Sequence, residues 1–240
     1  MWDEFVLEFT KTFIRDSRWK VFVNGFKNTM LITLVAALIG IAAGIIVSLV
    51  HQLASPKKSA KSSSFSYWAL KILDKICQAY VAVMRGTPLA VQLTIMAFII
   101  MAGYSNKIVV CCVAFGINSG AYVSEVIRGG IESVDIGQTE AGRSLGLSRL
   151  STLRIIVLPQ AVKSILPALC NEGIAILKET SIVGLIAVTD LTRASDLVRS
   201  RTMSPYFPLI SVAIVYFVLV FGLSKAVGVL ERRMKRSDRG

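Results

Sequence analysis

Long stretches of the chain contain no charged side chain, and this feature limits the possible folds more than any other. Uncharged runs cover residues 28–50, 86–106 and 202–224, and a shorter one covers 108–124. A helix needs about 20 apolar residues to cross the hydrocarbon core of a bilayer, so the three long runs meet that requirement. Hydrophobic residues make up 54% of the chain, whereas soluble domains contain about 45–50% even with glycine counted. The pattern predicts an all-α membrane protein that crosses the bilayer several times.

The net charge of +12 is unevenly distributed along the chain. Basic clusters are typical of nucleic-acid-binding proteins, but here Lys and Arg gather in 57–85, in 143–163 and in the tail 232–240. Cytoplasmic loops of membrane proteins are rich in these two residues. We therefore expect these segments to be cytoplasmic and no nucleic acid to bind. Five spans would then place the N-terminal segment 1–28 outside, although its five basic residues favour the opposite side.

Residues that commonly hold metals or perform catalysis are sparse. His51 is the only histidine, and the four cysteines lie in apolar or amphipathic surroundings. The cysteines lack the paired spacing of a zinc site, so we interpret them as small packing residues. The sequence therefore predicts no metal site, no cofactor and no enzymatic activity of the chain itself.

Helical segments are predicted from the apolar runs and their periodicity. A Lys/Ser-rich connector over 55–66 is expected to be mobile. An amphipathic helix over 67–84 is expected to enter the bundle from the cytoplasmic side, before the proline in 85–88 breaks it. Gly40 and Gly44 are spaced so that another helix can approach closely. The expected spans are 29–50, 89–103, 108–131, 164–188 and 205–224.

The polar segment between the third and fourth expected spans indicates two short helices. Thr139–Leu145 is expected to form the first, with Gly146 in the left-handed conformation at its C-terminal end. Ser148 is a suitable N-cap for the second helix, 149–157, which Pro159 would close.

The same segment is partly apolar although it lies outside the expected spans. Its apolar side chains need a protein surface to cover them, because they cannot reach lipid. Glu140 would lie near the start of the first helix, where a carboxylate interacts favourably with the helix dipole. The apolar positions concerned are Leu145, Leu147, Leu150 and Ile155.

This segment resembles the cytoplasmic loop of bacterial ABC importer permeases. That loop is described as Glu-Ala-Ala, three residues, Gly, nine residues, Ile, one residue and Leu-Pro. The matching positions are Glu140, Ala141, Gly142, Gly146, Ile156, Leu158 and Pro159. Gly142 replaces the second alanine, and Glu-Ala-Gly is the form associated with the polar amino acid branch, the histidine/glutamine/arginine-type permeases. Further matches to that branch are Arg85–Leu89, Asn118–Tyr122, Arg128–Gly130, Asn171–Glu172 and Lys178–Ser181, and the resemblance spans about 25–231.

The resemblance implies a type I ABC importer permease fold with about five transmembrane helices. The transmembrane domain would cover 29–231, include the coupling loop 132–163 and precede the basic tail 232–240. In the family, the loop inserts into a groove of a separate ATPase subunit, and the permease lies in the bacterial inner membrane. The chain contains no G-x-x-x-x-G-K-[ST] phosphate loop, which agrees with a separate ATPase.

The family also implies further partners. An extracytoplasmic substrate-binding protein would deliver a polar amino acid, and a second permease subunit, either identical or a sister chain, would complete the transport path through the lipid bilayer. Arg193, Asp196, Arg199 and Arg201 would then lie either on the surface that receives the binding protein or in a solvated loop.

Ionisable residues within membrane helices are costly and therefore indicate function. Glu125 and Arg128 are three residues apart and can pair on one helix face, so we interpret them as a structural or gating pair rather than as substrate contacts. Glu172 and Glu179 share a helix face, and they either line a water-filled path or form ion pairs. The candidates for the translocation path or its gate are Asn118, Glu125, Arg128, Glu172, Lys178 and Glu179.

Intramembrane acids also fit a protein of another class, an ion-coupled secondary transporter or channel. Such folds often contain internal repeats with paired broken helices. The sequence contains no second copy of 140–159 or of 171–181, and five spans are few for such a transporter. The alternative is therefore the weaker of the two.

Overall fold

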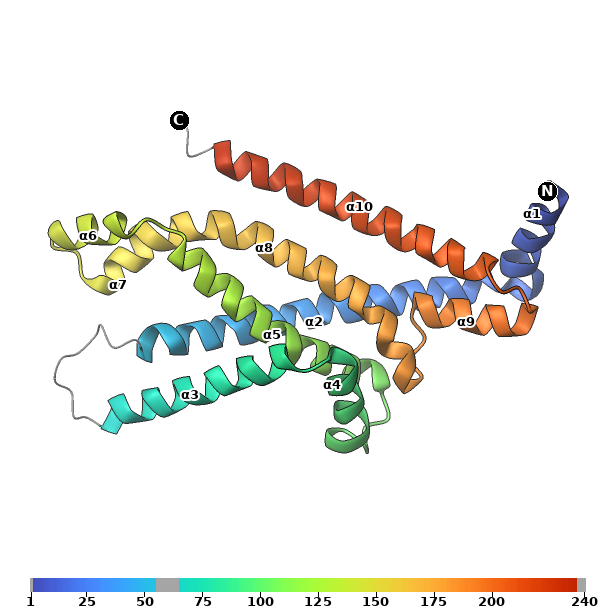
Figure 1. The fold of residues 1–240 in the computed structure, drawn as a ribbon, viewed down its shortest axis with the longest axis horizontal. Coiled ribbons are helices and arrows are strands. Elements are labelled where there is room, and N and C mark those ends of the chain that lie inside the picture. Colours follow the sequence, from blue (N-terminus) through green and yellow to red (C-terminus); the bar gives the residue numbers. More distant parts are fainter. Residues whose placement is uncertain (1, 55–64, 237–240) are drawn as a thin grey trace. The chain divides into compact units, whose positions relative to one another are not determined.

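The computed structural model describes residues 2–54 and 65–236, and every regular element in that part of the chain is a helix (Figure 1). The long helices are α2 (Trp19–Ala54), α3 (Phe65–Gly86), α5 (Lys107–Glu132), α8 (Leu158–Glu179) and α10 (Phe207–Arg236). The short α-helices are α1 (Trp2–Phe9), α4 (Leu89–Ile95), α6 (Ile136–Ser144), α7 (Arg149–Thr152) and α9 (Leu191–Thr202). Single π-helical or 3-10 segments are η1 (Thr10–Ile14), η2 (Arg15–Ser17), η4 (Met96–Ile100), η5 (Leu153–Val157) and η6 (Thr180–Ile186).

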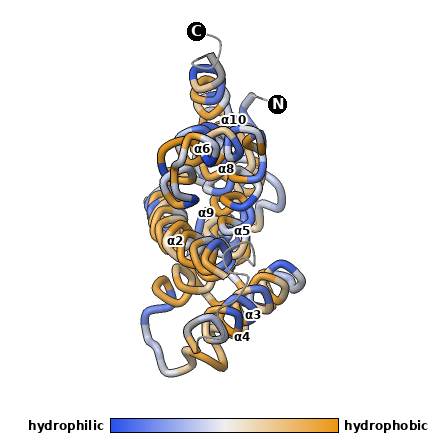
Figure 2. The backbone as a smooth tube through the Cα atoms, turned by 90° about the vertical axis from the view of Figure 1, so that its left-hand side faces the viewer, coloured by the Kyte–Doolittle hydropathy of each residue, from blue (hydrophilic) through white to orange (hydrophobic). Residues whose placement is uncertain are grey.

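Four of the described helical segments are long and apolar enough to cross a membrane, as the sequence predicted. They are Trp19–Ala54, Lys107–Glu132, Arg149–Ile186 and Phe207–Met234. Apolar residues predominate in α2 (Figure 2). Because helices satisfy their own backbone hydrogen bonds, they are the form in which such segments are stable in lipid.

The expected span 89–103 is not a continuous helix. α4 has 7 residues and η4 has 5, which together extend about 18 Å at ~1.5 Å per residue, too short for a hydrocarbon core of about 30 Å. The helix breaks before Pro88, whose ring restricts the preceding residue and removes an N–H donor. A fifth candidate span arises only when α3 and α4 with η4 are taken as one broken pair.

The sequence predicted that Pro159 would close the second short helix, and this prediction is wrong. The helix passes through η5 into α8, so Arg149–Ile186 forms one candidate span. In η5 the Leu158 N–H donates to the Leu153 oxygen, and this wider turn accommodates a proline that lacks its own donor. Two other predicted segments have different bounds in the structure. The fourth span begins before residue 164, and α10 continues to Arg236 through part of the expected tail.

The Lys/Ser connector lies largely outside the described residues, and so does the end of the basic tail. Of the connector, residues 55–64 are not described, whereas Phe65 already belongs to α3. Residues 237–240 of the tail are likewise not described.

The chain divides into two compact units. The first unit comprises Met1–Ala37, Pro88–Phe115 and Gly173–Ser224. The second comprises Leu38–Thr87, Gly116–Glu172 and Lys225–Gly240.

In the first unit, the polar stretch after the fourth span forms a helix, α9, rather than a loop. Its N-cap is Asp190, which is fully buried and accepts hydrogen bonds from the backbone N–H groups of Thr192 and Arg193, both at 2.9 Å. The hydroxyl of Tyr216 also donates to the Asp190 carboxylate, at 3.2 Å. An Asp at this position satisfies helix donors that have no partner within the helix. The apolar side of α9 enters a core made of Phe22, Leu191, Ala194, Val198 and Val212.

In the second unit, α2 and α5 approach each other through glycines, as the spacing of Gly40 and Gly44 predicted. A Cβ atom on Gly40 would lie 2.7 Å from Ser119 Oγ, and one on Gly44 would lie 2.4 Å from Val123 Cγ1. On the facing helix, a Cβ on Gly120 would lie 2.7 Å from the Ala43 Cβ. Small residues allow membrane helices to pack at such short separations.

The first prediction concerns this contact. We expect Gly44→Val to lower the stability of the purified permease by about 1–3 kcal/mol, because the new side chain overlaps Val123 and the helices must separate. The measurement is the thermal unfolding midpoint in detergent. Gly222→Val is the matched control, because a Cβ at Gly222 meets no heavy atom within 4 Å. Equal midpoints for the two variants would contradict the close contact of α2 and α5.

Candidate coupling element and polar clusters of the membrane helices

The two short helices of the candidate coupling element are connected by a compact turn. α6 is capped by Asp135, whose side chain accepts from the Gly137 N–H at 2.6 Å. At its end, Gly146 has φ of +84°, and its N–H donates to the Arg143 oxygen at 3.1 Å. The Leu147 N–H donates to the Gly142 oxygen at 3.1 Å. This pair of bonds around a left-handed residue is the Schellman motif, and it confirms the predicted conformation of Gly146.

The second helix begins as predicted. The Ser148 hydroxyl accepts from the Ser151 N–H at 3.1 Å and caps α7. A correction applies to Glu140: α6 begins at Ile136 and has no acidic residue in its first turn. Glu140 therefore lies beyond the region where the helix dipole acts, and Asp135 occupies the capping position instead.

Gly142 packs directly against the second short helix. It is buried, and a Cβ there would lie 2.8 Å from both Ile156 Cδ1 and Thr152 Cγ2. Alanine at this position would require those side chains to move. The contact gives a physical reason for the Glu-Ala-Gly form of the loop and joins two of its matching positions, Gly142 and Ile156. Leu158 and Pro159 continue into the first turn of α8.

Several large apolar side chains of this element are uncovered. The exposed fraction is 82% for Leu145, 68% for Leu150, 63% for Ile155 and 66% for Ile136. Glu140 and Ala141 are exposed as well. The element therefore has one face that packs through Gly142 and another that presents apolar groups.

A second cluster is centred on Glu125, near the end of α5. Its Oε1 accepts from Arg128 Nε at 3.2 Å, and its Oε2 accepts from Arg128 Nη2 at 2.9 Å, which confirms the predicted pair. The same Oε2 lies 3.1 Å from Nη1 of Arg85, at the end of α3. Arg128 also donates to Glu132 Oε2 at 2.6 Å. One carboxylate thus binds a guanidinium group of its own helix and, through Arg85, connects α5 to α3.

This cluster borders a cavity of about 500 Å³ between α2, α3 and α5. On its other side, His51 Nδ1 lies 2.9 Å from Asp74 Oδ1 and joins α2 to α3. Most of the cavity wall is apolar, but acidic and basic side chains both border it although its helices belong to candidate spans. The charged or titratable residues that line it are His51, Asp74, Arg85, Glu125, Arg128 and Glu132.

A third cluster brings polar residues of α5 into contact with α3 and α8. Asn118 donates to the Met84 oxygen at 3.2 Å, and the Tyr80 hydroxyl donates to the Ile117 oxygen. Ser119 donates to Glu172 Oε1 at 2.9 Å. Asn118 and Ser119 are both buried, so these bonds satisfy groups that would otherwise be costly to remove from water.

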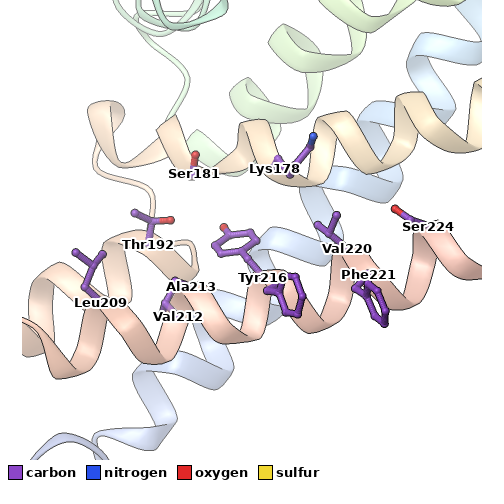
Figure 3. Close-up of a pocket in the computed structure, with 11 residues that line it drawn as sticks. Lys178, Ser181, Thr192, Leu209, Val212, Ala213, Tyr216, Val220, Phe221 and Ser224 are labelled. Carbon is purple, nitrogen blue, oxygen red and sulfur yellow. The ribbon is translucent and has the colours of Figure 1, made fainter.

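Lys178 and Glu179 belong to the first unit, where both are exposed. Lys178 borders a cavity of about 560 Å³ formed by the end of α8, η6, α9 and α10 (Figure 3). Most of its walls are apolar, with polar groups contributed by Ser181, Thr192, Tyr216 and Ser224. Lys178 therefore lies at the edge of a mainly hydrophobic cavity, and its nitrogen points away from the α10 side chains (Figure 3).

The sequence reasoning missed several members of these clusters. Arg85 and Ser119 stood in the matched motifs but had not been chosen, because nothing in the sequence indicates which side chains of α3, α5 and α8 meet. Glu132 follows Arg128 by four residues, a spacing that favours a helical ion pair and could have identified it. Asp190 is followed three residues later by Arg193 rather than by Glu or Gln, so it lacked a capping-box signal.

Comparison with known proteins places these features in context. Residues 63–236 match the family model described as binding-protein-dependent transport system inner membrane component. The arginine transport system permease protein ArtQ of Bacillus subtilis (strain 168) is 36% identical, over 90% of this chain and 93% of its own length. The glutamine transport system permease protein GlnP of Escherichia coli (strain K12) is 32% identical, over 89% of this chain and 92% of its own.

Solved structures agree with these relatives. A chain of an amino acid ABC transporter crystallised with histidines superposes with a TM-score of 0.79 at 38% identity, over 89% of this chain and 94% of that one. A chain of the MetNI methionine ABC transporter, in an inward-facing conformation, has a TM-score of 0.75 at 16% identity and supports the fold alone. The chain is therefore all-helical with the type I ABC permease fold, and it belongs to the family of inner membrane components of binding-protein-dependent transport systems, the multi-pass permease subunits of ABC importers.

Proposed function

We propose that this chain forms the translocation path for a polar amino acid and is driven by a separate ATPase that binds its cytoplasmic coupling element. The observation that carries the proposal is the α6–Gly146–α7 element, which displays uncovered apolar side chains next to the matched loop positions. The substrate class is supported by relatives named for arginine, glutamine and L-cystine transport, all at 32% identity or more.

The coupling element has the properties of a docking helix. Leu145 and Leu150 are exposed, and covering such a side chain with protein contributes about 1.5–3 kcal/mol. A short amphipathic helix seated in a hydrophobic groove is a recurring mode of recognition. We assign the groove to the ATPase subunit and the transmission of its closure to α8, because η5 joins the element to that membrane helix without a break.

We assign the Glu125 cluster to gating rather than to substrate binding. Both carboxylate oxygens of Glu125 are already engaged by Arg85 and Arg128, and two guanidinium groups beside one carboxylate leave a net positive charge that disfavours a substrate ammonium. The side chains are about a third to a half exposed, with values of 30% for Glu125 and 44% for Arg85. Ion pairs of this exposure contribute up to about 1 kcal/mol, which a conformational change of the permease can break and reform.

The path itself is assigned to polar side chains of α5 and α8. Ser119 donates a hydrogen bond to Glu172. Asn118, the residue before Ser119, is buried as well. A zwitterionic amino acid needs both anionic and cationic contacts. In the second unit the candidate for such a contact is Glu172, and in the first unit the candidates are Lys178 and Glu179. Ionisable groups at membrane depth are expensive and are retained where they line a water-filled path.

The orientation follows the distribution of basic residues. The coupling element and the C-terminal tail are placed in the cytoplasm, and the N-terminal segment with α9 is placed outside, where a substrate-binding protein would dock. A second permease subunit, either identical or a sister chain, completes the path. An ion-coupled carrier or channel remains the alternative, and the coupling element argues against it because such a protein has no ATPase to bind.

A test of the coupling element uses Gly146. Gly146→Val should abolish uptake while the permease is present at normal levels, because a β-branched residue resists φ of +84° and re-aims α7. Gly146→Asn is the matched control and should retain most transport, since Asn tolerates the left-handed region. Glu140→Lys, which reverses an exposed charge, should weaken ATPase binding without loss of the permease. Uptake, co-purification of the ATPase and stimulated hydrolysis are measured; normal transport by Gly146→Val and Glu140→Lys would mean that the element only connects spans.

The path assignment is tested at Glu172 and Glu179. Glu172→Gln and Glu179→Ala should lower uptake at least tenfold while the ATPase still co-purifies, because the path loses charge but not its fold. Ser119→Ala is the control for Glu172, since it removes the hydrogen bond and leaves the carboxylate. Loss of the assembled complex in both carboxylate variants would instead favour structural ion pairs.

The gating assignment is tested by a double-mutant cycle. Arg85→Gln and Glu125→Gln should each raise ATPase activity of the reconstituted complex in the absence of binding protein, and the double variant should be no more active than Glu125→Gln. The expected coupling is about 0.5–1 kcal/mol, or roughly two- to fivefold in rate. The pair Asp196 and Arg199, which is 3.1 Å apart on α9, serves as a control cycle with little effect on basal activity. Fully additive effects of Arg85 and Glu125 would contradict a shared gate.

A further inference from the structure

The first described helix has an apolar stripe that the rest of the described chain covers only in part. At about 100° per residue, Trp2, Phe5, Val6 and Phe9 fall on one side of α1, and their exposed fractions range from 43% for Phe9 to 75% for Trp2. The acidic residues Asp3, Glu4 and Glu8 fall on the other side. α1 is thus amphipathic, with an anionic polar face.

Aromatic contacts fix this helix against the start of a candidate span. The ring of Phe5 lies edge-on to Phe207 with centroids 5.4 Å apart, and Phe207 is the first residue of α10. Phe13, in η1, contacts Phe9 at 5.1 Å and Phe207 at 6.4 Å. The stripe of α1 therefore lies at the level where α10 begins.

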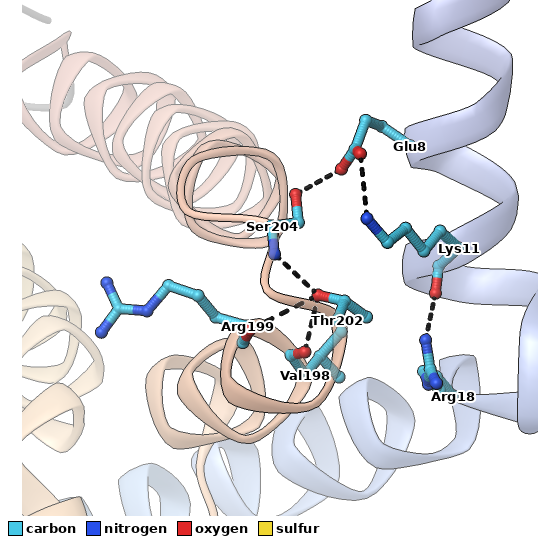
Figure 4. A network of polar contacts seen from close by, with 7 residues as sticks. All are labelled: Glu8, Lys11, Arg18, Val198, Arg199, Thr202 and Ser204. Atoms are coloured by element: carbon cyan, nitrogen blue, oxygen red, sulfur yellow. Dashed lines mark hydrogen bonds and ion pairs between the residues drawn. The ribbon is translucent and has the colours of Figure 1, made fainter.

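Polar contacts hold the other side of α1 to the turn between α9 and α10 (Figure 4). Ser204 donates to the Glu8 carboxylate, and Lys11 Nζ donates to Glu8 Oε1 at 3.4 Å. Arg18 Nη1 donates to the Lys11 oxygen at 2.6 Å. The hydrogen bond from Ser204 lowers the pKa of Glu8, so this carboxyl is ionised at neutral pH. The acidic side of α1 is thereby engaged, and the apolar stripe is left outward.

The stripe is continuous with an exposed apolar face of α10. Phe207, Ile210, Ile214 and Phe217 recur at helical spacing on one face, and the last three are 57–66% exposed. In a multi-pass membrane protein, such a face contacts lipid. Trp19, at the start of α2, is 48% exposed, and tryptophans concentrate at the boundary between lipid and water.

We propose that α1 is an interfacial helix that lies in the bilayer surface beside the first turn of α10, with Trp2, Phe5, Val6 and Phe9 inserted at the boundary between headgroups and acyl chains. The occupant of the stripe is lipid, not protein, because Phe207 joins the stripe to a face that already faces lipid. Insertion is driven by the apolar residues alone, since three acidic residues give α1 no attraction to anionic headgroups. The proposal depends only on the chain being a membrane protein, and not on its substrate or its ATPase.

Tryptophan fluorescence provides the test, because the chain has only three tryptophans. The full-length protein with Trp19→Phe and Trp68→Phe is reconstituted in phosphatidylcholine vesicles whose acyl chains carry bromine either near the headgroup or near the chain end. We expect blue-shifted emission from Trp2 and at least twofold quenching by bromine near the headgroup, with less quenching from the deeper position. Added anionic lipid should leave the quenching unchanged.

Two variants separate insertion from simple proximity. Val6→Glu, on the stripe, should reduce the quenching of Trp2 at least twofold, whereas Leu7→Glu, off the stripe and 63% exposed, should not. If the background with one tryptophan folds poorly, the difference in quenching between the unmodified chain and Trp2→Phe gives the same information. Red-shifted, unquenched emission would place α1 in water, and blue-shifted but unquenched emission would place a protein on the stripe. Either result would overturn the proposal, as would quenching that requires anionic lipid.

Discussion

The close approach of α2 and α5 determines where the polar groups of the second unit lie. Ser119 occupies the space that a side chain at position 40 would fill, so only glycine fits there. Ser119 in turn donates a hydrogen bond to Glu172. Without the glycine contact, the Ser119 hydroxyl would not be fixed between α2 and α8. A packing requirement of the backbone therefore positions the carboxylate that we assign to the path. Small residues such as Gly40 thus affect the proposed path through the packing of the helices and not through a chemical group of their own.

Glycine has two different roles in the coupling element. At Gly142 the requirement is space, because Ile156 and Thr152 occupy the volume of a side chain. At Gly146 space is free, and the requirement is the positive φ that ends α6. The absence of a side chain at Gly142 allows the two short helices to pack closely, and the backbone conformation of Gly146 sets the angle between them. The exposed leucines are thereby held in a fixed arrangement, which would reduce the ordering cost of the docking that we propose.

Much of the fold follows from local patterns, whereas most of the contacts do not. The charge-free runs and the signals at Gly146 and Ser148 depend on neighbouring residues. The structure confirms both signals and every run except 86–106, which does not form a span of its own. The break before Pro88 was visible in the sequence, but the shortness of α4 was not, because apolar residues continue beyond the helix end. The prediction at Pro159 was wrong because a π-helical turn accommodates the proline, and the residue types of the segment do not indicate such a turn. The partners of Glu125 and Glu172 lie on other helices, and a single sequence without contact information does not identify them.

The location of Arg85 connects the ion cluster with the broken helix. Arg85 is next to the last residue of α3, directly before the break at Pro88, and its guanidinium binds Glu125 on α5. At this end of α3 the Met84 oxygen is held by a side chain, Asn118, and not by a further helical turn, so the end moves more easily than a helix centre. A pair attached to such an end responds to small displacements, whereas the Glu125–Arg128 pair within α5 does not change when α3 moves. Glu125 can therefore exchange one partner while keeping the other, and in the gating role that we propose, opening would break a single partly exposed ion pair.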